Sequence, residues 1–255
     1  MKRKSLAYSI ILLLTLAVTA CAKPKTNESK SPLPSAQTVL TEAVKSNFKT
    51  MRATWRQTNA EGKVLQKTEA KYNHQPLVLY ANFTTNSNHY QIWLDHKASY
   101  VKMQGTATNQ WFKTKLSKSS SYAQLTDDAA KAALLSFTDH AKLFKVKQTN
   151  GYQLTYQGTS GKIWHDISGN NVITSIIGLD LNEVKPAEMK VKIATDKKYQ
   201  LQAIMIDAAY SESGSKKHLQ FSVDQINKLP ALKIPSKIQK AAIYLGKWES
   251  KNENS

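Results

Sequence analysis

Residues 90–116 read YQIWLDHKASYVKMQGTATNQWFKTKL, and their pattern is the strongest indication of the fold. Apolar and polar residues alternate in three short runs, and turns rich in Asn, Gly, Ser and Lys separate the runs. A period of two residues is typical of β-strands that bury one face. Strands joined by such short connections pair in antiparallel order. The stretch therefore predicts three strands of an antiparallel meander.

The same alternation continues on both sides of this stretch. Further strands are expected at about residues 51–57, 63–72, 77–85, 145–149, 152–157, 187–195, 199–210 and 217–227. Helical spacing of apolar residues is found from Ser35 or Ala36 onward, after Thr126, and around Gly161–Ile167, and a last helical turn is expected within Lys228–Gly246. About ten strands with two or three helices predict an α+β fold built on one curling antiparallel sheet. The helices must bury their apolar stripes against one face of that sheet.

The N-terminal segment has the order of a secretory signal peptide. Basic residues 2–4 precede an apolar run over residues 6–18, which is too short to span a bilayer, since spanning needs about 20 residues. The following Val18-Thr19-Ala20-Cys21, with the chain's single cysteine, resembles the lipobox of bacterial lipoproteins. That resemblance implies cleavage between Ala20 and Cys21 and a lipid on the Cys21 thiol. The alternative is a secreted protein with an accidental cysteine.

The chain is strongly basic. Its 36 basic and 18 acidic residues give a formal charge of +18, and loss of residues 1–20, which hold three basic residues and no acid, leaves +15. Such a field attracts anionic lipid head groups, wall polymers or nucleic acid. The lysines are spread along the chain, however, so a solvated lysine-rich surface explains the charge equally well. No nucleic-acid recognition motif is present, and no nucleic-acid partner is expected.

A family resemblance is carried by the opening stretch. A strand ends in a short acidic turn, a second strand reads Tyr-x-Lys-x from Tyr100, and a third begins with Trp111-Phe112-Lys113. This pattern is similar to half-barrel lipoproteins of Gram-positive bacteria, which are related to the LolA-like carriers and to the mycobacterial LppX and LprG group. Residues 233–237 and Ala241-Ala242 resemble the end of such domains. The resemblance covers most of residues 36–245. It implies a strongly curved half-barrel sheet with the helices on its concave face and an apolar cavity between them.

These patterns divide the chain into four parts. A signal peptide (1–20) is followed by a lipidated N-terminus with a disordered tether (21–35), because residues 22–35 offer almost nothing to bury. The half-barrel domain is expected at 36–246 and a disordered tail at 247–255.

The expected ligand-binding residues share one apolar face of the sheet. They are Tyr90, Ile92, Leu94, Val101, Met103, Phe112, Met189, Val191, Leu201 and Phe221, and Met205 is expected beside Leu201 on the same face. A curved apolar face that helices cover incompletely leaves a pocket suited to an apolar ligand. The alternative is that these residues fill an ordinary closed core, which is what alternating apolar faces usually indicate.

Motifs for catalysis are missing from the sequence. The six histidines include no His-x-x-x-His pair, so no metal site is expected, and Asp139-His140 and His165-Asp166 are typical of exposed polar positions. Ser213-Gly214-Ser215-Lys216 matches Ser-x-x-Lys but reads as a turn, and no nucleophile elbow or phosphate-binding loop occurs. Neither an enzyme nor a cofactor is expected.

The sequence thus predicts a lipid-anchored protein on the outer face of the cell membrane. We expect a monomer that binds a lipid or another apolar ligand between sheet and helices, without catalysis. The rival hypothesis is a basic interaction module with a closed core, which docks an envelope protein or an anionic wall polymer.

Overall fold

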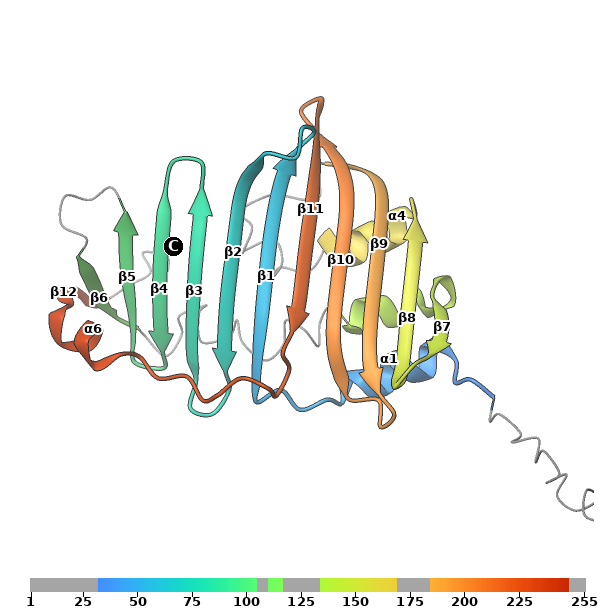
Figure 1. Ribbon diagram of the computed structural model, residues 1–255, viewed down its shortest axis with the longest axis horizontal. Coiled ribbons are helices and arrows are strands. Elements are labelled where there is room, and N and C mark those ends of the chain that lie inside the picture. Colours follow the sequence, from blue (N-terminus) through green and yellow to red (C-terminus); the bar gives the residue numbers. More distant parts are fainter. Residues whose placement is uncertain (1–31, 105–109, 117–133, 169–183, 248–255) are drawn as a thin grey trace, which may run out of the picture. The chain divides into compact units, whose positions relative to one another are not determined.

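Twelve strands form one open, curved sheet in the residues that the computed structural model describes, which are 32–104, 110–116, 134–168 and 184–247 (Figure 1). The first six strands are β1 (Thr50–Asn59), β2 (Val64–Asn73), β3 (Val78–Thr85), β4 (His89–Asp95), β5 (Ala98–Gln104) and β6 (Trp111–Lys115). The others are β7 (Lys145–Gln148), β8 (Gly151–Gly158), β9 (Lys185–Asp196), β10 (Leu201–Glu212), β11 (Ser215–Asp224) and β12 (Ile243–Lys247). The helices are α1 (Ala36–Val44), the 3₁₀-helix η1 (Ala141–Leu143), α4 (Gly161–Ser168) and α6 (Ser236–Ala241), and residues 134–138 are also helical.

The sheet consists of two meanders. Its strand order is β12-β6-β5-β4-β3-β2-β1-β11-β10-β9-β8-β7, so β1 through β6 and β7 through β11 each pair in sequence. The antiparallel pair of β1 with β11 joins the two meanders, and β12 pairs in parallel with β6. The expected α+β class with a single curved sheet is confirmed. The count of about ten strands was low, because β12 was expected as part of an irregular C-terminal segment.

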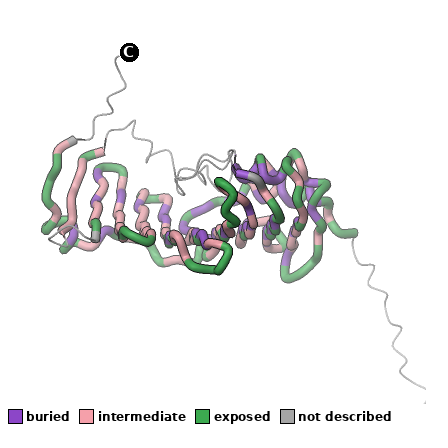
Figure 2. Tube along the Cα trace, turned by 90° about the horizontal axis from the view of Figure 1, so that it is seen from above, coloured by how far each residue is buried: buried purple, intermediate pink, exposed green. Residues whose placement is uncertain are grey.

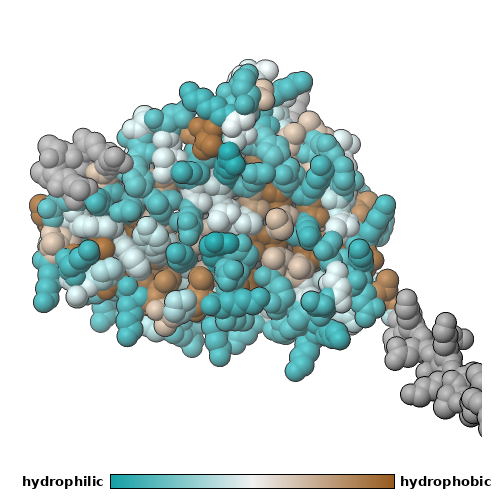
Figure 3. Space-filling model, in the orientation of Figure 1, coloured by the Kyte–Doolittle hydropathy of each residue, from teal (hydrophilic) through white to brown (hydrophobic). Residues whose placement is uncertain are grey.

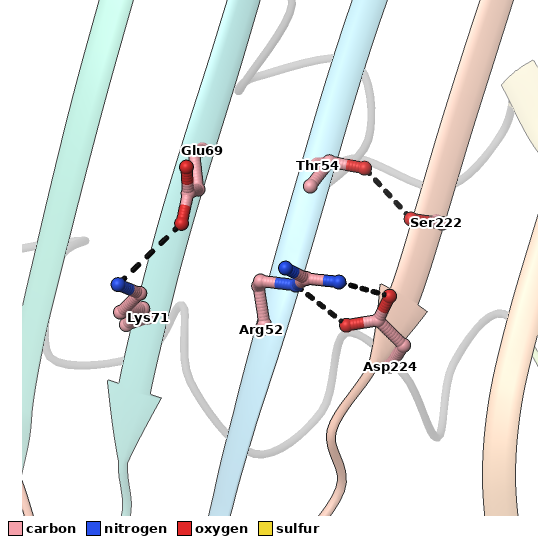
Figure 4. A network of polar contacts seen from close by, with 6 residues as sticks. All are labelled: Arg52, Thr54, Glu69, Lys71, Ser222 and Asp224. Carbon is pink, nitrogen blue, oxygen red and sulfur yellow. Dashed lines mark hydrogen bonds and ion pairs between the residues drawn. The ribbon is translucent and has the colours of Figure 1, made fainter. Parts of the chain in front are cut away.

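Outward side chains strengthen the junction of the two meanders. Arg52 on β1 donates two hydrogen bonds to Asp224 on β11, at 2.7 and 2.8 Å, and the hydroxyl groups of Thr54 and Ser222 lie 2.7 Å apart (Figure 4). The hydrogen bond to Asp224 raises the pKa of Arg52, which is thus charged at any physiological pH. A bidentate pair of this kind adds geometric specificity to the charge interaction, and here it joins two residues that are directly opposite each other in the register of β1 on β11.

The helix α1 forms where the spacing of apolar residues predicts it. The Ser35 hydroxyl accepts a hydrogen bond from the Thr38 amide at 3.0 Å, which caps the N-terminus of the helix. Val39, Leu40 and Ala43 lie on one side of the helix and are fully buried in a cluster with side chains of the sheet. The helix expected after Thr126 begins outside the described residues.

The hairpin predicted at Asn150-Gly151 joins β7 to β8 as expected. Glycine is required at position 151, because a Cβ atom there would lie 2.0 Å from the Thr195 carbonyl oxygen on the neighbouring strand β9. Ser213 and Gly214 both have positive φ angles in the turn between β10 and β11, which confirms that the Ser-x-x-Lys match is a turn.

We call the side of the sheet that the helices cover the inner face, which is its concave side (Figure 2). The main core lies between this face and α1, residues 134–138, η1 and α4. Its largest fully buried side chains include Tyr210, Phe137, Leu40, Leu154, Ile163 and Ile193. The strands that contribute to it are mainly β8 through β11, together with β1.

A second, smaller core lies on the outer face of β3 to β6. The C-terminal segment crosses that face, and Ile234 and Ile238 pack there against Val78, Ala98 and Tyr100. Trp93, Trp111, Leu232 and Ala242 are partly buried around them. The C-terminal segment therefore packs on the outer face of β3 to β6. The helices of the main core lie on the opposite, inner face, and they cover the other half of the sheet.

Candidate functional site: an uncharged apolar surface on the inner face

The inner face of β3 to β6 carries a continuous apolar surface. Alternate residues of a strand point to the same side, and the strand pairing aligns them in rows across the sheet. One row runs from Ala81 through Ile92 and Val101 to Phe112, and another runs from Phe83 through Tyr90 to Met103. We call these side chains, with Leu79 and Leu94, the inner apolar surface.

The side chains of this surface are less buried than those of the main core. Tyr90, Ile92, Val101 and Phe112 are half-buried, and Met103 is 37% exposed. Leu94, in contrast, is only 2% exposed. Of the residues that form the two buried clusters described above, none belongs to this surface. The inner face is therefore apolar in both halves of the sheet. It is closed core over β8 to β11 and only half-buried over β3 to β6.

The structure separates the ten expected ligand-binding residues into two groups. Six of them, Tyr90, Ile92, Leu94, Val101, Met103 and Phe112, lie together on the inner apolar surface. Met189, Val191 and Leu201 are at most 1% exposed and lie within the main core. Phe221 is half-buried and packs against that core.

Three further members of the surface, Leu79, Ala81 and Phe83 on β3, were not predicted from the sequence. Their alternation with Tyr80, Asn82 and Thr84 is a readable signal that could have identified them. Met205 was wrongly placed on the inner face. The register of β10 shifts between Leu201 and Ala203, and Met205 consequently points outward and is 50% exposed.

The inner face of the first meander carries no charge in its described strands. The strand pairing places every Lys, Arg, Asp and Glu of β1 to β6 on the outer face. These residues are Arg52, Arg56, Lys67, Glu69, Lys71, Asp95, Lys102, Lys113 and Lys115. Figure 3, which views the outer face, shows mainly hydrophilic side chains there. The inner surface therefore offers an apolar, uncharged environment to any ligand.

The outer face carries a groove of about 450 Å³ over β8 to β10. Lys145, Lys190 and Lys192 line it together with the exposed side chain of Met205. Asp207 also lines this groove, and its carboxylate lies 2.6 Å from His218 Nε2. Of the ion pairs among described residues, none involves the three lysines.

One expectation about the histidines was wrong. His140 Nδ1 lies 2.7 Å from Asp166 Oδ2, and Asp166 on α4 is only 7% exposed. Burial raises the pKa of this carboxyl group, and the hydrogen bond from His140 partly opposes that effect. Asp139 and His165 are exposed, as expected. The pair ties η1 to α4 within the layer of helices.

No group of three or more His, Cys, Asp and Glu side chains in the described part of the chain could hold a metal ion. Ala20 and Cys21 lie outside the described residues. In the described ranges, no helix has both the length and the apolar character that crossing a membrane requires.

These features define a class of protein: a curved antiparallel sheet whose inner face is sealed by helices in one half and carries an uncharged apolar surface in the other. The chain belongs to the family of unknown function DUF6612, which matches residues 33–243. No curated protein matches the chain.

Several solved structures are similar to this one, including a lipoprotein and a DUF1329 family protein. The Mycobacterium tuberculosis lipoprotein LppX is 13% identical, with a TM-score of 0.42, and the match covers 78% of this chain and 98% of that chain. A DUF1329 family protein from Desulfovibrio piger is 11% identical, with a TM-score of 0.21, over 74% of this chain and 90% of that chain.

Proposed function

We propose that this protein binds a lipid or another apolar ligand on the inner apolar surface, without catalysis. One observation carries the proposal: the apolar inner face is closed core over β8 to β11 but is half-exposed over β3 to β6. Apolar residues that gather on one face without being sealed into a core are typical of binding sites. The residues assigned to the ligand are Tyr90, Ile92, Val101, Met103 and Phe112.

The energetics suit a hydrocarbon chain. Each methylene that leaves water for an apolar surface gains about 0.8 kcal/mol, so a chain of about ten methylenes gains about 8 kcal/mol. Losses of translational and conformational freedom oppose this gain, by about 4 kcal/mol or more. The net gain is then at most about 4 kcal/mol, which corresponds to a Kd of about 1 mM or weaker, so tighter binding requires a longer chain or further specific contacts.

The site would work close to a membrane. Under this proposal, Cys21 carries the lipid anchor after cleavage behind Ala20, and the domain stands on the extracytoplasmic face. Residues 22–35 span at most about 50 Å when fully extended. That reach lets the inner apolar surface approach the bilayer from which an apolar ligand would come.

Binding of the neutral fluorescent probe N-phenyl-1-naphthylamine to residues 22–255 tests the proposal. The variant Ile92→Glu places a charge on the inner apolar surface, and we expect its affinity for the probe to fall at least tenfold. Gln91→Glu introduces the same charge one residue away on the outer face and should bind like the wild type. Val101→Thr, which keeps the side-chain volume, should weaken binding less than Ile92→Glu. Equal binding by the wild type and both inner-face variants, or no binding by the wild type, would contradict the proposal.

The lysine-lined groove over β8 to β10 favours a second candidate function, the docking of an anionic partner. Its three lysines lack acidic partners among the described residues, and Met205 adds an exposed apolar contact. Binding to vesicles that contain anionic phospholipid should then weaken steeply with salt. The triple variant Lys145→Gln, Lys190→Gln and Lys192→Gln should lose this binding, whereas Lys67→Gln with Lys71→Gln and Lys102→Gln, which removes the same charge over β2 and β5, should retain it.

A further inference from the structure

Two residues that each hold a buried polar atom lie opposite each other at the end of the apolar surface that borders the main core. Trp55 on β1 and Thr68 on β2 are directly opposite each other in the strand register, and their side chains are 2% and 9% exposed. The Trp55 Nε1 and Thr68 Oγ1 atoms are both buried and have no hydrogen-bond partner among the described residues. A buried polar group without a partner is destabilising, and native proteins rarely contain two as neighbours.

Their position connects the main core to the inner apolar surface. Trp55 belongs to the main core, and Thr68 continues the same row through Phe83 and Tyr90 to Met103. Phe83 and Tyr90 have ring centroids 6.1 Å apart and are half-buried. A hydrocarbon chain lying along this row would thus end beside the two polar atoms.

The chemistry of the two groups selects a particular kind of ligand atom. The indole N–H of Trp55 can only donate, and the Thr68 hydroxyl can donate as well. Donors on two residues that face each other across neighbouring strands suit one oxygen atom with two lone pairs. A carboxylate there would be a buried charge, and the inner positions of β1 to β6 carry no cation to pair with it. A neutral carbonyl oxygen meets both requirements.

We propose that the ligand is a neutral acyl ester whose carbonyl oxygen accepts hydrogen bonds from Trp55 Nε1 and Thr68 Oγ1. Its acyl chain lies over Phe83, Tyr90 and the rest of the inner apolar surface. This inference rests on the proposed function and adds the chemical class of the ligand to it.

Displacement of bound N-phenyl-1-naphthylamine by three ligands of equal chain length tests the inference. The ligands are methyl laurate, laurate at about pH 8 and dodecane, compared after correction for their solubility. We expect methyl laurate to bind the wild type about tenfold more tightly than dodecane, the ratio that one net hydrogen bond supplies. Laurate should bind more weakly than its methyl ester.

The variant Thr68→Val removes the hydroxyl group while keeping the shape of the side chain. It should lower the ratio of methyl laurate to dodecane affinity, because one of the two donors is lost, and leave dodecane binding unchanged. It should also raise the Tm of the ligand-free protein by about 2–4 °C, because an unpartnered buried hydroxyl is lost. Trp55→Phe should likewise reduce the preference for the ester.

Thr195→Val is the matched control. Thr195 on β9 is 4% exposed and its hydroxyl also has no partner among the described residues, but β1, β11 and β10 separate it from Thr68. This variant should raise the Tm in the same way and keep the preference for the ester. Equal affinities of the wild type for ester and dodecane, or an unchanged ratio in Thr68→Val, would overturn the inference but not the proposed function. Absence of binding by the probe and all three ligands would overturn both.

Discussion

The carboxyl group of Asp166 is buried in the layer of helices, and its environment makes the stability of the fold depend on pH. Burial raises its pKa from the ordinary value of 3.8, and His140, 2.7 Å away, partly opposes that shift. A carboxyl group whose pKa is raised in the folded state binds its proton more tightly there than in the unfolded chain. Its contribution to stability is therefore fully present below pH 3.8 and is lost as the pH rises through the raised pKa.

The variant His140→Ala should lower the free energy of unfolding by about 1–3 kcal/mol at neutral pH, because it leaves a buried carboxylate without its hydrogen-bond donor. The loss should shrink as the pH falls through the raised pKa of Asp166, where the carboxyl group becomes protonated and neutral. Urea denaturation at several pH values measures both effects. His165→Ala, which removes an exposed histidine from α4, should leave stability within about 0.5 kcal/mol of the wild type. A loss in His140→Ala that does not depend on pH would contradict this account of Asp166.

At the scale of single residues, the alternation of apolar and polar positions could predict which face of the sheet a side chain occupies where strands are regular. It did so for Tyr90, Ile92 and Val101. It was wrong at Met205, because a shift of register inside β10 reverses the faces and leaves no mark on the spacing of apolar residues. It also could not pair His140 with Asp166, or Trp55 with Thr68. The members of the first pair are 26 residues apart, and only the packing of elements brings them together.

At the scale of elements, the C-terminal segment covers the outer face of β3 to β6. Helix α6 places Ile238 on the small outer core, and β12 then pairs in parallel with β6 and protects its edge (Figure 1). The sequence predicted a helical turn in this segment but not β12. A short strand that pairs with a partner about 130 residues earlier in the chain depends on that partner rather than on its own pattern.

Ile238→Ala should therefore destabilise the protein, by about 2–3 kcal/mol, because Ile238 is 6% exposed and its removal leaves a cavity. The matched substitution Ile243→Ala in β12 should have an effect below about 0.5 kcal/mol, since Ile243 is 51% exposed. Chemical denaturation of the two variants side by side measures the difference. Equal effects would show that α6 does not hold the outer face as the structure indicates.

For the molecule as a whole, the two meanders share one inner face with two different roles. The helices seal the part formed by the second meander, and the first meander presents its uncharged apolar surface half-exposed. The sequence predicted the α+β class, the single antiparallel sheet and a shared apolar face, because these follow from periodicity. It could not predict which strands the helices cover. That division depends on contacts between distant segments, and it is the reason why Met189 and Val191 lie in closed core while Tyr90 and Ile92 do not.

The most direct measurement is native mass spectrometry of residues 22–255 purified from the protein's own host, followed by identification of any co-purified molecule. The account predicts a second mass species, heavier than the polypeptide by one neutral acyl lipid. Ile92→Glu should remove that species and Gln91→Glu should retain it. A spectrum with the bare polypeptide alone, or a bound lipid that persists in Ile92→Glu, would contradict the assignment of the inner apolar surface as the binding site.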